Sequence, residues 1–138
     1  MNPSMLRLTL ACAALFLALE GVSMELSAHA DDKDITSREA RKKNPLTPDE
    51  KNLAAAKALY QKHCADCHGA RGNGDGKCAV DLDPKPSDLT VPDMARRSDG
   101  ALFWRISRGR RPMPAFEKLT REDERWLLVL YLRTLSKK

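Results

Sequence analysis

Apolar and polar residues divide the chain into three regions. An apolar run extends from Leu6 or Leu8 to Leu19 and ends at Glu20. Residues 31–43 are densely charged and contain almost no apolar side chains. From about residue 47 onward, apolar residues recur at the spacing of one helix face. The pattern predicts a leader over residues 1–30, a charged N-terminal arm over residues 31–46 and one domain over residues 47–138.

The first predicted helix of the domain begins near residue 47. Thr47 is suited to cap it, Pro48 fits its first turn and Glu50 completes a capping box. Residues that follow at helical spacing form one face of this helix, namely Leu53, Ala56, Tyr60 and His63. The helix is therefore expected to end close to Cys64.

Two further helices are predicted in the second half of the chain. One begins at Ser98-Asp99 and stops at Gly109, and its apolar residues are Leu102, Phe103 and Ile106. The other follows Thr120 and Asp123, which resemble a capping box, and its apolar residues are Trp126, Leu127, Leu130 and Leu135. No strand-like alternation of period two is present, so we expect an all-α fold.

Glycine and proline dominate the connections between these helices. The segment from Gly69 to Gly76 is a loop that no regular element would tolerate. It is not a phosphate-binding loop, because no strand precedes it and no Gly-Lys-Ser/Thr ends it. Pro84, Pro86 and Pro92 predict that the next segment is extended.

The leader has the features of a secretory signal peptide. Arg7 precedes the apolar run, and Ala28-His29-Ala30 has the small-x-small pattern of a cleavage site. At about a dozen residues, the run is too short to span a bilayer. We predict cleavage after Ala30 and a periplasmic protein, with a retained N-terminal anchor as the alternative.

Size and charge restrict the function of the exported part. Removal of 30 residues from 138 leaves 108, which is one small domain with a thin core. The leader contains Arg7, Glu20 and Glu25, so the formal net charge is +5 for the full chain and +6 for the part that remains after cleavage. This charge suits an acidic protein surface. We expect no nucleic-acid partner, because no aromatic platform or helix-turn-helix pattern is visible. The charged arm is expected to be solvated.

The chemistry of the chain is concentrated in Cys64-Ala65-Asp66-Cys67-His68. Cys-x-x-Cys-His is the attachment site of a c-type haem: both thiols bond to the haem vinyl groups, and the histidine reaches the iron. A thioredoxin-like site would need a βαβ context, and a structural zinc site would need a second pair of ligands. Neither is present, since the remaining cysteines and histidines are Cys12, Cys78, His29 and His63. A bound porphyrin would also supply apolar mass to the thin core.

Met113 is the candidate for the second iron ligand. A thioether is a weak, soft ligand, so a methionine that binds iron must be held by a stiff backbone. Pro112 and Pro114 flank Met113 and provide that stiffness. Met113 follows His68 by 45 residues, which is enough chain to reach the opposite face of a porphyrin. Met94 is interpreted as core packing.

Together, these segments resemble the class I monohaem c-type cytochromes. The likeness runs from about Asn44-Pro45 to Leu135 and includes the Cys64–His68 motif, Gly72-Asn73-Gly74-Asp75-Gly76, Pro84-Lys85-Pro86, Ser98 to Trp104 and Met113-Pro114-Ala115-Phe116. The resemblance implies a small cytochrome c fold of about three to five helices wrapped around one covalently bound haem c.

The resemblance also implies roles for individual residues. Cys64 and Cys67 would form the thioether bonds, His68 would be the proximal ligand and Met113 the distal ligand. The carbonyl of Pro84 or Pro86 would accept the proton on the far ring nitrogen of His68. The first and last helices would cross at Ala56, where many relatives carry glycine.

Three further features leave alternatives open. Cys78 is the only cysteine of the exported part without a haem role, and it is expected to be a buried, reduced thiol; the alternative is a bridge to a partner. His63 directly precedes Cys64 and is interpreted as a surface residue. The arginines near the methionine loop either steer an acidic redox partner or pair with propionates and nearby carboxylates; they are Arg105, Arg108, Arg110 and Arg111.

Two function classes remain. With both axial positions filled, the protein is not an enzyme but an electron carrier, either free or as a subunit of a respiratory or dehydrogenase complex. We expect it to be monomeric when free, to bind redox proteins and to contact a membrane only through a partner complex. An open sixth position would instead indicate a haem enzyme, such as a peroxidase, or a gas sensor. The first class is favoured because Met113 is present and no distal acid-base group is evident.

Overall fold

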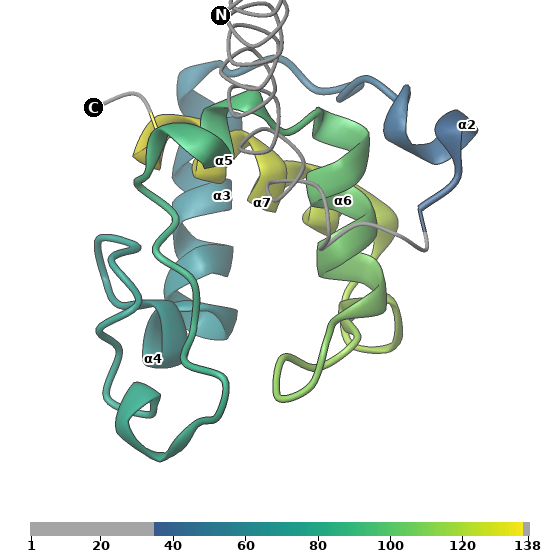
Figure 1. Ribbon diagram of the computed structural model, residues 1–138. Helices are drawn as coiled ribbons and strands as arrows, with labels where there is room; N and C mark the ends of the chain where they lie inside the picture. Colours follow the sequence, from purple (N-terminus) through teal and green to yellow (C-terminus); the bar gives the residue numbers. More distant parts are fainter. Residues whose placement is uncertain (1–34, 137–138) are drawn as a thin grey trace, which may run out of the picture. The chain divides into compact units, whose positions relative to one another are not determined.

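The computed structural model describes residues 35–136, and this part of the chain is helical (Figure 1). The α-helices are α2 (Ser37–Ala40), α3 (Glu50–His63), α4 (Ala65–His68), α5 (Pro92–Arg96), α6 (Asp99–Arg108) and α7 (Glu122–Leu135). Two short 3₁₀ helices are η1 (Ala79–Asp81) and η2 (Phe116–Lys118). The predicted all-α fold is confirmed. There are more helices than the expected three to five because α2, α4 and α5 span only four or five residues each.

The three long helices correspond to the predicted ones, but two of them begin later than expected. The cap of α3 is Asp49, whose carboxylate accepts a hydrogen bond from the backbone N–H of Asn52 at 2.8 Å. The hydroxyl of Thr47 instead donates to Asp49. The start of α7 is shifted in the same way, because the Thr120 hydroxyl donates to the carbonyl of Phe116 and caps no helix. The Glu124 carboxylate accepts from the backbone N–H of Arg121 at this end.

The predicted limits of α6 are confirmed. The side chain of Ser98 accepts a hydrogen bond from the backbone N–H of Ala101 at 3.1 Å. At the other end Gly109 has φ +66°, and a Cβ there would clash with the carbonyl oxygen of Pro114. Only glycine adopts this conformation readily in so little space, so Gly109 both ends the helix and lets the methionine loop fold back against it.

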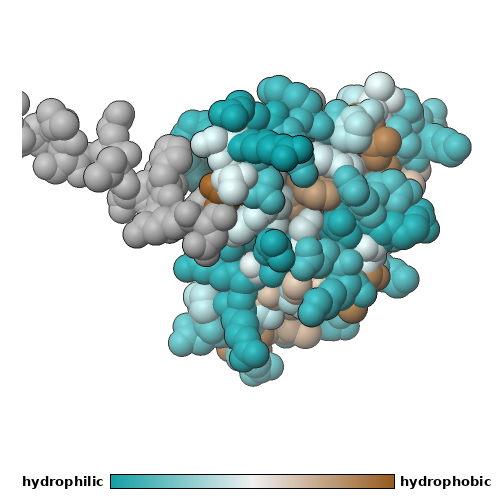
Figure 2. Space-filling model, turned by 90° about the vertical axis from the view of Figure 1, so that its right-hand side faces the viewer, coloured by the Kyte–Doolittle hydropathy of each residue, from teal (hydrophilic) through white to brown (hydrophobic). Residues whose placement is uncertain are grey.

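The core lies where α7 packs against α3 and α6 (Figure 1). Ala56 on α3 and Val129 on α7 have no exposed surface, as expected for two helices that cross closely. The ring of Trp126 stacks on that of Phe103, with 4.0 Å between their centroids. The outer surface is mainly hydrophilic on the face shown in Figure 2, with apolar residues scattered over it. No helix among residues 35–136 is long and apolar enough to cross a membrane.

The described part of the arm differs from the solvated segment that its composition predicts. Thr36 and Glu39 form a capping box that begins α2, and α2 packs against α6. The Ser98 hydroxyl donates to the carbonyl of Ala40 at 2.6 Å, and the Asn44 side chain donates to the carbonyl of Trp126 at 2.9 Å. Polar contacts therefore fasten the arm without the apolar stripe that a sequence pattern would reveal. The predicted leader and cleavage site lie outside the described residues.

The segment between η1 and α5 has no regular structure, and it bends at residues 83–84 and 89–91, so it is less uniformly extended than its prolines predict. Pro92 is the first residue of α5 rather than part of the extended chain. Proline is favoured at this position, because its missing N–H would have no helical partner there. The guanidinium of Arg133 on α7 joins this region to α6: it donates to the carbonyl of Arg97 and, at 2.6 Å, to the carboxylate of Asp99.

Candidate functional site

The structure brings Cys64, Cys67 and His68 together on one turn. The N–H of Cys64 donates to the carbonyl of Tyr60 and closes α3, and the carbonyl of Cys64 accepts from His68 at 2.8 Å. Cys67 and His68 belong to α4, which follows immediately. All three side chains are partly buried, and the two thiols are free. A single turn thus presents two thiols and an imidazole side by side.

The glycine-rich loop holds this turn in place. Carbonyl groups at the end of a helix lack partners within the helix, and here the loop supplies them. The N–H groups of Gly74, Gly76 and Cys78 donate to the carbonyls of His68, Cys67 and Asp66 at 2.8, 3.1 and 2.8 Å. A Cβ at Gly76 would clash with the carbonyl of Asp66, so this close approach requires glycine. The loop is therefore a backbone clamp on α4.

Tyr60 fastens the start of the same loop from inside the core. Its side chain is fully buried, its hydroxyl donates to the carbonyl of Gly69 at 2.8 Å, and its ring lies 4.7 Å from that of Tyr131. Burial raises the pKa of Tyr60, so the hydroxyl remains a donor at all physiological pH values. This bond links α3 directly to the residue that follows His68.

Replacing Tyr60 with phenylalanine should lower the free energy of unfolding by about 1–3 kcal/mol, because the buried carbonyl of Gly69 loses its donor. Chemical denaturation of the haem-loaded protein measures the loss. Tyr131→Phe is the matched control, since the Tyr131 hydroxyl has no hydrogen bond within residues 35–136. Equal unfolding midpoints for Tyr60→Phe and the unmodified protein would contradict the role of this bond.

The imidazole of His68 is oriented by a backbone carbonyl. Its Nδ1 lies 3.0 Å from the carbonyl oxygen of Ser87, which corrects the expectation that Pro84 or Pro86 supplies this acceptor. Because Nδ1–H donates to Ser87, Nε2 carries the lone pair that can bind a metal. Burial lowers the pKa of His68, and the bond to Ser87 opposes this shift, so the imidazole is favoured in its neutral, ligating form.

The thiols differ in their surroundings. Burial raises the pKa of Cys64 to about 12. Burial also raises the pKa of Cys67, and the thiol of Cys78 beside it adds to the shift. Cys78 is partly rather than fully buried, which differs from the buried thiol expected of it, and it forms no disulfide within residues 35–136. Its proximity to Cys67 was not foreseen, because the loop that folds Cys78 back gives no signal in the sequence.

Met113 lies in the loop between α6 and η2. Two backbone hydrogen bonds join it to Arg110. The N–H of Arg110 donates to the carbonyl of Met113 at 3.0 Å, and the N–H of Met113 donates to the carbonyl of Arg110 at 2.7 Å. Its side chain is partly buried against the hydrophobic core, as is that of Met94 on α5. In Figure 1, this loop extends below α6, on the opposite side of the molecule from α4. The two candidate ligands thus come from opposite sides of the helical frame.

His63 and the arginines are more engaged than the sequence suggests. The His63 ring makes an edge contact with Phe116, with centroids 5.9 Å apart, so it reaches η2 just beyond the methionine loop. Arg105 lies over the ring of Trp104 at 5.4 Å, and Arg108 pairs with Glu117 at 3.4 Å. Local pairing therefore accounts for some of these arginines.

The donor set fits haem c. Two free thiols lie three residues apart on one turn, a neutral imidazole follows with Nε2 available, and a thioether is anchored on the facing loop. Cys64, Cys67 and His68 would hold the group from one side, and Met113 would approach from the other. The hydrogen bond on Nδ1 of His68 and the backbone bonds of Met113 orient these two residues as ligands. Neither contact adds a second side chain that could act as a catalytic acid or base.

Comparison with known proteins agrees with this geometry. The family model of cytochrome c oxidase, cbb3-type, subunit III matches residues 51–132. Among solved structures, the chain is similar to part of a reducing HAO-like protein complex from Kuenenia stuttgartiensis, with 35% sequence identity and a TM-score of 0.61. The match covers 67% of this chain and 47% of that one, so the present chain spans about half the length of that relative. No curated protein matches it.

The matched region contains the cysteine and histidine motif, the glycine-rich loop, the methionine loop and most of α7. Haem c is the covalent prosthetic group of this family, and electron transfer is its role. The chain belongs to the cytochrome c family, in the branch of cbb3-type cytochrome c oxidase subunit III.

Proposed function

We propose that this protein is a periplasmic carrier that passes single electrons between redox proteins, with His68 and Met113 filling both axial positions of one haem c. The observation that carries the proposal is the bond from Nδ1 of His68 to the carbonyl of Ser87, which leaves Nε2 as the ligating atom. The paired backbone bonds of Met113 support the second ligand.

When bound, the haem supplies a one-electron couple between ferric and ferrous iron. The residues of the chain orient the ligands, hold the attachment turn and shield the iron. Ser87 fixes the plane of His68, and the loop that donates to Asp66, Cys67 and His68 keeps the attachment turn rigid. Met113 would keep small molecules off the iron, and the apolar cluster that includes Phe116 would limit access of water to it. Rigid ligands that keep their places in both oxidation states favour rapid electron transfer.

The partner that exchanges electrons with such a carrier is a redox protein rather than a small substrate. The similar solved structure is part of a redox complex, which supports docking to a larger redox assembly. Free in solution, the chain is proposed to be a monomer that docks transiently.

A redox titration combined with a peroxidase assay tests this function. We expect one reversible one-electron transition and no turnover of hydrogen peroxide with an organic reductant. Sustained peroxide turnover by the unmodified protein at neutral pH would contradict the proposal and indicate an accessible iron.

Electron exchange with an acidic redox protein should slow as salt is added. Exposed charges are screened beyond about 8–10 Å at physiological ionic strength, so the association rate should carry the effect. Replacing the exposed Arg111 and Lys118 with serine should slow exchange a few-fold at low salt and weaken its salt dependence. Stopped-flow mixing at several salt concentrations measures this.

The matched control is Lys51→Ser, which removes an exposed charge at the start of α3, far along the helix from α4. Its exchange rate should equal that of the unmodified protein. A rate that does not depend on ionic strength would rule out steering by the methionine-loop charges.

A further inference from the structure

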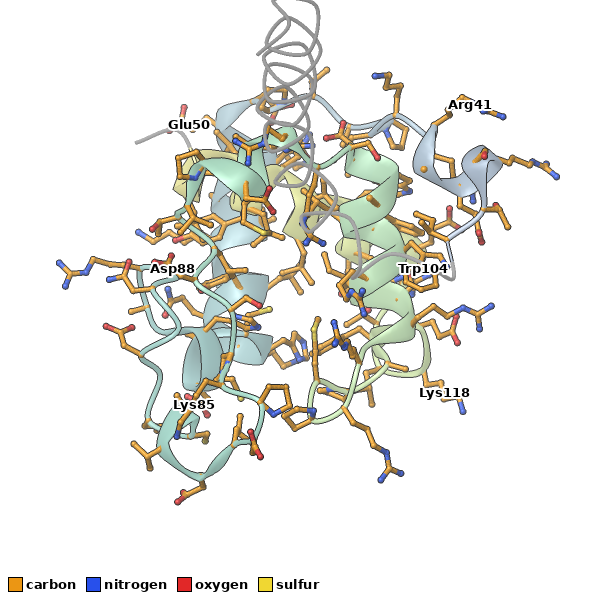
Figure 3. All side chains as sticks on the ribbon, in the orientation of Figure 1. Arg41, Glu50, Lys85, Asp88, Trp104 and Lys118 are labelled. Atoms are coloured by element: carbon orange, nitrogen blue, oxygen red, sulfur yellow. The ribbon has the colours of Figure 1, made fainter. Side chains whose placement is uncertain are left out.

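A cavity of about 140 Å³ lies on the outer side of α6. Its wall combines the arm, α6, η2 and α7, and the residues that matter here are Glu39, Lys42, Ser107, Arg108, Glu117 and Arg125. Trp104 also lines it, and Figure 3 shows Trp104 on the side of α6 that faces away from α3 and α4. The cavity is therefore separate from the attachment turn of the haem.

Two buried polar atoms in this wall lack hydrogen-bond partners. Arg125 is 9% exposed and Ser107 is 7% exposed, and neither Arg125 Nε nor Ser107 Oγ has a hydrogen bond in the described structure. The Nη1 of Arg125 donates to the carbonyl of Thr120 at 2.7 Å, and the guanidinium lies 5.2 Å from the ring centre of Phe103. No ion pair joins Arg125 to a carboxylate within residues 35–136. A buried charge without a counter-ion is strongly unfavourable.

The two carboxylates in the wall are engaged elsewhere. Glu39 accepts hydrogen bonds from the hydroxyl and the backbone N–H of Thr36 at 2.9 and 3.2 Å, and these bonds lower its pKa. Glu117 pairs with Arg108 at 3.4 Å. Lys42 on the arm adds a further positive charge at the rim. The wall therefore has an excess of positive charge, and its buried cation has no internal counter-ion.

The free edge of Arg125 has a defined shape. Because Nη1 is bound to Thr120, Nε–H and one Nη2–H remain side by side, and this edge matches two oxygens of a planar oxyanion. The hydroxyl of Ser107 is an additional donor in the same wall. The cavity is also several times larger than the roughly 30 Å³ that one water molecule occupies in the liquid.

We propose that this cavity binds a small planar oxyanion of the carboxylate class, which accepts hydrogen bonds from Arg125 and Ser107. The anion is the missing counter-ion of Arg125. It would join α7 to α6 and to the arm, since Glu39 and Lys42 form part of the same wall. The site serves neither haem attachment nor electron transfer and so stands independently of the proposed function.

Formate titrated into the haem-loaded protein tests the proposal, with chloride added to keep the ionic strength constant. We expect saturable binding at one site by calorimetry, with a matching rise in the melting temperature. Arg125→Met should weaken formate binding roughly 10- to 100-fold, as expected for lost bonds to a charged group. Ser107→Ala should weaken it less. Arg121→Met, which removes an exposed arginine beside the same helix, should leave binding unchanged.

The same measurements separate anion binding from a structural role of Arg125. If Arg125 only supported Thr120 and Phe103, its replacement would lower the melting temperature equally with and without formate. We expect the difference between the unmodified protein and Arg125→Met to widen as formate is added. Equal formate responses in both proteins, or a crystal structure that holds only water in the cavity at saturating formate, would overturn the proposal.

Discussion

Replacing Met113 with alanine should lower the reduction potential, convert part of the ferrous haem to the high-spin state and allow carbon monoxide to bind readily. Thioether ligation favours ferrous iron, so its loss shifts the potential downward by a sizeable part of the roughly 0.8 V that axial ligands span. The paired backbone bonds with Arg110 fix the position of residue 113 in the loop, and an alanine at that position has no atom that can bind the iron. Potentiometry and absorption spectra of the ferrous protein measure these changes.

Met94→Ala provides the control for this experiment. Met94 is also a partly buried methionine in contact with the core, but it lies on α5 and its backbone carbonyl accepts from Arg133. Its replacement should alter stability alone and leave both potential and spin state unchanged. If Met94→Ala reproduced the changes and Met113→Ala did not, the assignment of the distal ligand would be wrong.

Replacing both Cys64 and Cys67 with serine should abolish covalent attachment of the haem. The two thiols are the only groups on the turn that can form thioether bonds, and the hydroxyl of serine does not add to the vinyl groups in the same way. Acid-acetone extraction should then remove all the haem from the variant and none from the unmodified protein. The variant should also unfold more readily, because a thin core loses its fixed porphyrin.

Cys78→Ser tests whether this effect is specific. Cys78 lies beside Cys67 and is a free thiol in a similar environment, yet it is not expected to carry haem. This variant should keep its haem through extraction. Release of haem from the unmodified protein under the same conditions would contradict the roles of Cys64 and Cys67.

The attachment turn could be predicted from the sequence because its chemistry is local. Cys64, Cys67 and His68 lie within five consecutive residues, so any helical turn brings them together. The ends of α6 were also predictable, since Ser98 and Gly109 act through bonds within the same helix. The starts of α3 and α7 were misplaced by two residues or fewer because several polar residues compete there for the same backbone groups.

Contacts between distant segments could not be predicted in the same way. The acceptor for His68 is a backbone carbonyl, and every residue of the extended segment has one, so the sequence does not distinguish Ser87 from Pro86. The arm is held by single polar bonds, from Ser98 at the start of α6 to Ala40 and from Asn44 to Trp126 on α7, and such bonds leave no periodic pattern. The burial of Arg125 has no sequence signal either, because a charged residue near a helix start normally indicates solvent exposure.

The reaction of the unmodified ferrous protein with carbon monoxide at neutral pH tests most directly whether His68 and Met113 fill both axial positions. Rapid mixing should show no carbon monoxide complex within the time in which an open haem would be saturated, because Met113 must first leave the iron. Immediate and complete formation of the complex would contradict the closed site and favour a haem enzyme or gas sensor.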